Sequence, residues 1–196
     1  MRQRRAKKTN YAFIDSQNLN LGTQKAGFKM DWRRFRKFLE EKYNVSHAYM
    51  FIGYMAENEQ LYEQLHEQGY LIALKRTMEI TSTEHKGTPQ EDEKTVVKGN
   101  IDADLVLYAM KEIPNYDKAI IVSGDGDFYG LIEYLAEQKK LLHVLTPNRQ
   151  YSSLLKEFDE YIVRIDQLRG QLAYRDRRRP GGLAAKSSKA PDPKKS

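Results

Sequence analysis

Short apolar runs alternate along the chain with segments whose apolar residues recur at helical spacing. The apolar runs, which we expect to form strands, cover residues 11–14, 47–55, 70–80, 119–122, 141–145 and 161–163. Helical spacing predicts helices after a cap at Asp31, over 57–68 and 101–112, around 131–135, and over 152–158. Strands that are apolar on both faces and alternate with helices are typical of a covered parallel sheet. The sequence therefore predicts an α/β, three-layer fold with a mostly parallel central sheet flanked by helices.

Charge divides the chain into a body and two ends. The formal net charge is +6, yet residues 1–8 carry +5 and residues 175–196 carry +6, which leaves −5 on the remainder. We predict a basic tail at 1–8, one domain at 9–168 that contains a polar loop at 81–93, and a basic, disordered tail at 169–196. Such tails attract a polyanion such as nucleic acid, or they are only solvated ends.

The composition excludes several classes of protein. Cysteine is absent, which removes disulfides, thiolate zinc sites and cysteine nucleophiles, and the four histidines are too scattered for a zinc site. No apolar run is long enough to span a bilayer, and the start of the chain lacks the pattern of a signal peptide. The glycine-rich phosphate loop, the dinucleotide fingerprint and the nucleophile elbow are missing as well. We therefore expect a cytoplasmic protein without membrane association.

Carboxylates follow two of the predicted strands, at the edge where parallel sheets usually carry their functional residues. Asp15 ends the first strand, and Asp125 and Asp127 follow the fourth. If these two strands are neighbours at the point where strand order reverses, the three carboxylates meet in one crevice. Taken singly, each aspartate is equally well explained as a helix cap or as a turn residue.

A fourth carboxylate comes from the helix before that strand, which contains Asp102 and Asp104. Two positions apart on a helix point about 200° away from each other, so both cannot face the crevice. Asp102 shares a face with Leu105 and Ala109, which we expect to be packed, and we therefore favour Asp102. Several carboxylates held together repel one another unless a cation lies among them. Mg²⁺ or Mn²⁺, which prefer oxygen ligands, are the expected cofactors.

Three segments of the chain resemble the motifs of the NYN family, PIN-like nuclease relatives that include the LabA-like proteins. Residues 13–19 (FIDSQNL) resemble its F-I-D-x-x-N-L opening, residues 97–102 (VKGNID) its K-G-x-x-D segment, and residues 122–128 (VSGDGDF) its S-G-D-x-D-F signature. The motifs occur in the expected order, and the resemblance covers residues 10 to 166. It implies a PIN-like fold and a Mg²⁺- or Mn²⁺-dependent ribonuclease activity.

The resemblance also implies roles for individual residues. The family's acidic, metal-binding and catalytic positions correspond to Asp15, Asp102, Asp125 and Asp127. The polar companion in the first loop would be Asn18, and the hydroxyl beside the metal would be Ser123, which would serve equally as a cap at the strand end. Lys98 would contact a phosphate, unless it is a solvated surface lysine. The residues that the resemblance implies for the site are therefore Asp15, Asn18, Lys98, Asp102, Ser123, Asp125 and Asp127.

One departure from the family pattern concerns Tyr108, because many relatives carry a further aspartate at that position of the helix. The change puts a second metal ion in question. Our leading hypothesis is an endoribonuclease that hydrolyses RNA phosphodiester bonds. The alternative from another class is a non-catalytic RNA-binding module with a degenerate metal site, and a third is an assembly protein that uses the fold for dimerisation. A homodimer is compatible with each of them.

Overall fold

Six parallel strands form the central sheet of the computed structural model, which describes residues 9–76, 78–80, 96–98 and 101–175. In spatial order they are β3 (Tyr70–Arg76), β2 (Val45–Tyr54), β1 (Asn10–Asp15), β6 (Ala119–Val122), β7 (Leu141–Thr146) and β8 (Ile162–Arg164). The predicted α/β fold with a parallel central sheet is confirmed.

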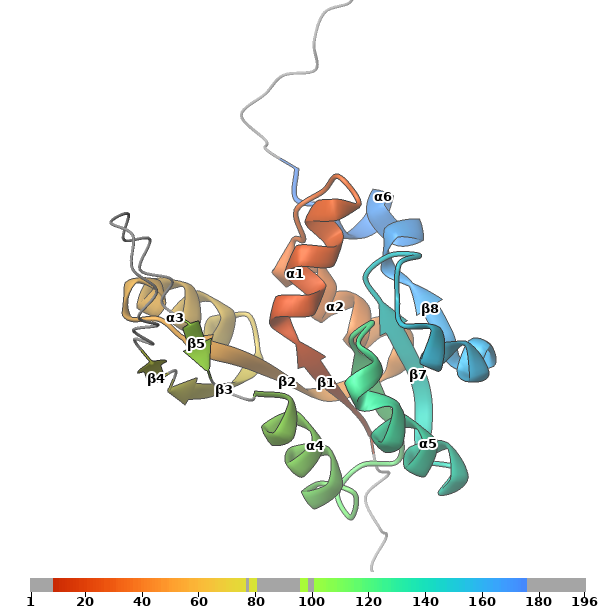
Figure 1. The fold of residues 1–196 in the computed structure, drawn as a ribbon. Coiled ribbons are helices and arrows are strands. Elements are labelled where there is room, and N and C mark those ends of the chain that lie inside the picture. The colour runs from red at the N-terminus through yellow and green to blue at the C-terminus, as the bar shows by residue number, and fades with distance from the viewer. Residues whose placement is uncertain (1–8, 77, 81–95, 99–100, 176–196) are drawn as a thin grey trace, which may run out of the picture.

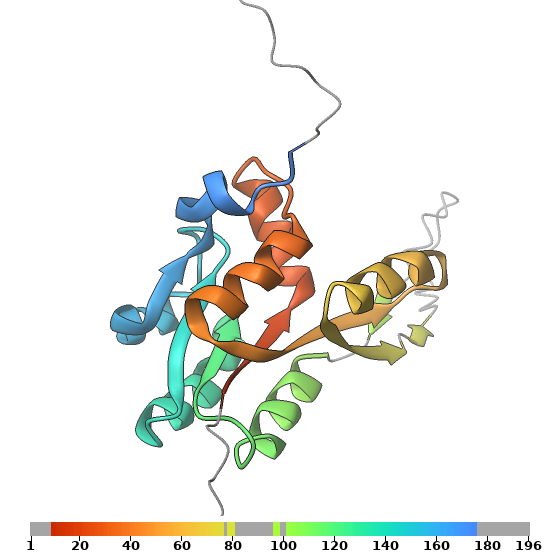
Figure 2. The ribbon, with the colours of Figure 1, turned by 180° about the vertical axis from the view of Figure 1, so that it is seen from behind.

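Helices cover both faces of this sheet (Figures 1 and 2). One face carries α1 (Ser16–Lys25), α2 (Trp32–Tyr43), α3 (Glu59–Glu67) and α6 (Arg169–Leu172), and the other carries α4 (Ile101–Lys111) and α5 (Tyr129–Glu137). Short 3₁₀ segments are η1 (Ala56–Asn58), η2 (Gly126–Phe128), η3 (Ser153–Tyr161) and η4 (Ile165–Leu168). None of the helices in the described part of the chain is long and apolar enough to cross a membrane.

The alternation of side chains along each strand produces two cores. In β1, Ala12 and Ile14 point to the face covered by α1 and α2, whereas Tyr11 and Phe13 point to the face covered by α4 and α5. Residues 11–15 of this strand are all buried, as expected for a strand inside a covered parallel sheet. The central strands are therefore fixed on both faces, and their ends form a rigid edge.

The chain reverses its direction of winding at β1 and β6. These strands are parallel neighbours, with Ile14 opposite Val122, while the chain continues from β1 toward β3 on one side and from β6 toward β8 on the other. The condition that we set for bringing the carboxylates together is therefore met. The edge beyond Asp15 and Val122 is the topological switch point, where parallel sheets bind their ligands.

Two segments differ from the expectation. The predicted strand 70–80 is divided into β3 and a separate strand, β4 (Met78–Ile80), which pairs antiparallel with β5 (Val96–Lys98). The sequence pattern did not predict α1, because only Leu19 and Thr23 of this polar helix are buried and it therefore lacks an apolar face. The predicted loop 81–93 and basic tail 1–8 lie outside the described residues.

The chain is ordered beyond residue 168, where we expected the C-terminal tail to begin. Helix α6 follows immediately, and Leu172 is buried in the core. The backbone then continues along the segment before α2, where the Asp31 N–H donates to the Leu172 carbonyl oxygen and Ala173 bridges Met30. Residues 169–174 thus cover the core on the face of the sheet that carries α1 and α2. Residues 176–196 lie outside the described part of the chain.

Candidate active site

Asp15 is the buried centre of the site, with 6% of its surface exposed. It is the last residue of β1 and caps α1, because its Oδ1 accepts a hydrogen bond of 3.0 Å from the Asn18 backbone N–H. Its Oδ2 accepts a second bond, also of 3.0 Å, from the hydroxyl of Ser123, the residue that follows β6. One carboxylate oxygen is therefore oriented by the first turn of α1 and the other by the residue that follows β6.

Burial raises the pKa of the Asp15 carboxyl above its ordinary value. The hydrogen bonds from Asn18 and Ser123 oppose this shift because they stabilise the charged form, whereas Asp102 and Asp125 raise the pKa further by repulsion. Asp15 is therefore a carboxylate whose negative charge is disfavoured by its surroundings, and a nearby cation would stabilise it.

The loop after β6 is held in place by hydrogen bonds to its backbone. Asn18 Oδ1 accepts from the Gly124 N–H at 2.9 Å, and Ser123 Oγ accepts from the Asp125 N–H at 3.1 Å. Asp125 in turn caps η2, because its Oδ1 accepts from the Asp127 N–H at 3.1 Å. This geometry leaves the side chains of Asp125 and Asp127 exposed at the surface of the site.

Asp102 lies in the first turn of α4, on the other side of the switch point from α1. Burial raises the pKa of its carboxyl, and repulsion by Asp125 and Asp127 raises it further. Asp15 is thus affected by Asp102 and Asp125, and Asp102 by Asp125 and Asp127, although these residues come from three separate segments. We call these four aspartates the carboxylate cluster.

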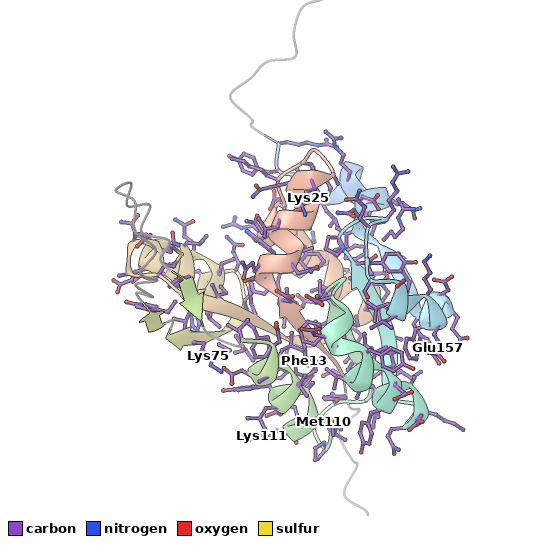
Figure 3. The ribbon with its side chains drawn as sticks, in the orientation of Figure 1. Phe13, Lys25, Lys75, Met110, Lys111 and Glu157 are labelled. Carbon is purple, nitrogen blue, oxygen red and sulfur yellow. The ribbon has the colours of Figure 1, made fainter. Side chains whose placement is uncertain are left out.

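Asp104 has a different environment, as expected from its position about 200° around the helix from Asp102. Its Oδ2 lies 3.1 Å from Nζ of Lys75, which extends from β3 toward α4 (Figure 3). On the same helix, Leu105 and Ala109 are buried. Tyr108 is partly exposed, and its ring contacts the rings of Tyr49 and Phe51 at centroid distances of 5.7 and 5.6 Å. Tyr108 therefore extends the aromatic packing of the sheet.

The donor set of the carboxylate cluster fits a hard divalent cation, because it consists of oxygen atoms whose charges repel one another. Within the described part of the chain, no three Asp, Glu, His or Cys side chains stand close enough together to hold one ion directly. Mg²⁺ commonly takes one or two protein carboxylates and keeps several water molecules, so a hydrated ion suits this arrangement. The side chain of Lys98, at the end of β5, is not among the described side chains.

A small cavity of about 160 Å³ adjoins Asn18 and Gly124 and brings in residues that the motifs did not reveal. Asn148, which follows β7, donates from Nδ2 to the Gly22 carbonyl oxygen at 2.7 Å, and its Oδ1 accepts from the Gln150 N–H at 2.7 Å. Asn148 therefore joins the loop after β7 to α1. The one sequence signal for Asn148 was its position three residues after the predicted strand 141–145, and no motif includes it.

The fold and the carboxylate cluster define an α/β protein with an acidic site at the switch point of a parallel sheet. The NYN domain model matches residues 11–166, and the chain belongs to the NYN domain family. The resemblance inferred from the three motifs is therefore confirmed. Membership relates the chain to the PIN-like nuclease superfamily and suggests an RNA-related nuclease role.

Two individual proteins extend this comparison. The chain is 23% identical over 172 residues to the low amplitude and bright protein LabA of Synechococcus elongatus, an alignment that covers 86% of this chain and 89% of LabA. A crystal structure of a protein of unknown function from Vibrio parahaemolyticus has the same fold, with a TM-score of 0.60 and 22% identity. That match covers 87% of this chain and 99% of the other.

Proposed function

We propose that the protein is a metal-dependent endoribonuclease that hydrolyses RNA phosphodiester bonds. Asp15, Asp102, Asp125 and Asp127 would hold a hydrated Mg²⁺ or Mn²⁺ ion, in part through its bound water molecules. The observation that carries the proposal is the placement of Asp15 at the switch point, where Ser123 donates to its carboxylate and where burial raises its pKa and Asp102 and Asp125 raise it further. Groups whose pKa is perturbed by burial and by like charges are characteristic of functional sites.

The residues around the cluster have roles that follow from their hydrogen bonds. Ser123 and the start of α1 hold the Asp15 carboxylate in one orientation, so that it need not reorganise when a cation binds. Asn18 fixes the loop that carries Asp125 and Asp127, whose exposed side chains face the solvent from which RNA would approach. A bound divalent ion supplies a more acidic water and neutralises phosphate charge. Lys98 remains a proposed phosphate contact.

Cleavage of end-labelled single-stranded RNA tests this proposal. We expect wild-type protein to cut the strand in Mg²⁺ or Mn²⁺ and to be inactive in EDTA. Asp125→Asn should lower the rate by about 100-fold or more, because charge stabilisation is the largest catalytic contribution. The folded structure should persist, since asparagine is also a good cap for η2. Asp104→Asn is the matched control, because Asp104 is paired with Lys75. Equal rates for wild type and Asp125→Asn would refute the proposal.

Tyr108 favours a second candidate, a non-catalytic RNA-binding module. Its ring packs against Tyr49 and Phe51 and supplies no carboxylate to the cluster. In the same assay this candidate is supported if purified wild-type protein binds the labelled strand but leaves it intact with either metal ion. Metal-dependent cleavage that Asp125→Asn abolishes would exclude it.

A further inference from the structure

A groove of about 510 Å³ adjoins the carboxylate cluster. It is lined by residues of α1, the end of β2, α3 and the start of α4. Figure 1 shows α1 and α3 on one side of the sheet and α4 on the other, so the groove lies at the edge of the sheet. Ser16 and Gln17, which follow Asp15, belong to its lining, as does Ile101, which precedes Asp102. The groove and the cluster therefore share a border formed by two of the same segments.

The walls of this groove are apolar and carry no charge among the described lining residues. Leu21, Met55 and Leu61 are 49%, 48% and 42% exposed, and all three belong to the lining, so they form a contiguous apolar surface of the kind that marks a binding groove. Trp32 is oriented from behind by Tyr70, whose ring meets it edge-on at 6.5 Å and whose hydroxyl donates to the Trp32 carbonyl oxygen. The groove thus offers a fixed aromatic ring and exposed apolar side chains without a counter-charge.

Amide side chains add hydrogen-bonding groups to the apolar walls. Gln17, Asn20 and Asn58 all belong to the lining, and each amide has donor and acceptor atoms. The hydroxyl of Tyr62 accepts from the Met55 N–H at 3.0 Å, which ties the end of β2 to α3. A flat, uncharged ring with polar edges matches such a lining, whereas a phosphate would find no positive group among the lining residues that the structure describes.

We propose that this groove binds an unpaired nucleobase of the RNA strand whose phosphodiester lies at the carboxylate cluster, an inference that rests on the proposed function. Proteins that recognise single-stranded RNA stack its bases on aromatic side chains and hydrogen-bond their edges. The neutral groove would receive the base, and the adjoining acidic site would receive the metal-bound phosphate. The protein would accordingly prefer single-stranded RNA over a fully paired duplex.

Trp32 provides a direct measure of occupancy because it is the single tryptophan of the chain. The full-length Asp125→Asn variant in Mg²⁺ is titrated with a 12-nucleotide RNA and with an abasic strand of equal length, while tryptophan fluorescence and affinity are recorded. We expect the ordinary strand to quench the tryptophan fluorescence and to bind about fivefold more tightly than the abasic strand. The reason is that stacking is the main contribution lost with the bases. Equal quenching and equal affinity for the two strands would overturn the proposal.

Substitutions in the groove test the site itself. Met55→Ala combined with Leu61→Ala should weaken binding of the ordinary strand and leave binding of the abasic strand unchanged. Leu107→Ala is the matched control, because Leu107 is 60% exposed on α4 and lies outside the groove lining. Unchanged affinity for the ordinary strand in the double variant would refute the groove as the base site. Base-dependent quenching together with a wild-type protein that never cleaves RNA would refute the nuclease and leave the base site standing.

Discussion

The hydroxyl of Ser123 donates a hydrogen bond of 3.0 Å to Oδ2 of Asp15 across the two central strands. The same oxygen of Ser123 accepts from the Asp125 backbone N–H at 3.1 Å. One buried hydroxyl therefore orients the most buried carboxylate of the cluster and also fixes the loop that carries two others.

Ser123→Ala should destabilise the protein. The substitution removes the donor to Asp15 and the acceptor of the Asp125 N–H, and a buried group left without its partner costs about 1–3 kcal/mol. The free energy of unfolding, measured by urea denaturation, should fall by that amount. Ser153→Ala is the control, because Ser153 is exposed and lies outside the cluster. A Ser123→Ala protein as stable as wild type would show that these bonds contribute little.

The close approach of α1 to the loop after β7 leads to a prediction about two helical glycines. A Cβ atom at Gly22 would lie 2.4 Å from Cβ of Pro147, so Gly22→Ala forces the helix and the loop apart. We expect a loss of about 1–3 kcal/mol, as is usual for overpacking. A Cβ atom at Gly130, in α5, would meet nothing within 4 Å. Gly130→Ala should therefore gain about 0.5–1 kcal/mol, and equal losses in urea denaturation would contradict this account.

Burial of the Asp102 carboxyl, together with repulsion by Asp125 and Asp127, predicts a pH-dependent stability of the metal-free protein. The raised pKa of Asp102 stabilises the fold below the unfolded-state pKa of about 3.9, and this contribution is lost as the pH rises through the folded-state value. At neutral pH the charged carboxylate therefore costs stability. Asp102→Asn should raise the urea midpoint at pH 7 in EDTA, and the gain should disappear at pH 3. A midpoint at pH 7 that is lowered would contradict the proposed repulsion.

His143 predicts the opposite pH dependence, a loss of stability as the pH falls. Burial lowers the pKa of its ring, which lies against Tyr43 and donates from Nδ1 to the Tyr161 carbonyl oxygen. Stability from the neutral ring is present above the unfolded-state pKa of about 6.5 and is lost as the pH falls through the folded-state value. His143→Gln should therefore flatten the fall of the urea midpoint below pH 6.5. An unchanged slope would mean that the ring does not control stability in this range.

Much of the fold was predictable because its strands are short, apolar and separated by amphipathic helices. The strand 119–122 is buried at every position, and its apolar run predicted it directly. Helix α1 escaped prediction because its formation depends on the Asp15 cap and on packing of Leu19, which a local pattern does not reveal. The sequence pattern also did not predict that the chain packs against the core beyond residue 168, because the burial of Leu172 depends on long-range contacts.

The candidate site was predictable as a set of residues, and its supporting contacts were not. Strand ends and helical geometry identified the four aspartates and separated Asp102 from Asp104. The bonds from Asn18 to Gly124 and from Asn148 to Gly22 join positions more than 100 residues apart, with sequence separations of 106 and 126. No periodicity within a segment encodes such contacts, and they emerged only when the strands were placed side by side.

Direct titration of the metal-free protein with Mn²⁺ tests the central claim that aspartates from separate segments share one cation. Wild-type protein, Asp102→Asn and Asp104→Asn are compared by isothermal titration calorimetry, because the two substitutions remove one carboxylate each from the same helical turn. We predict that wild type binds Mn²⁺, that Asp102→Asn weakens binding by about tenfold or more, and that Asp104→Asn binds as wild type does. Absence of Mn²⁺ binding by wild type, or equal weakening in both variants, would contradict the account.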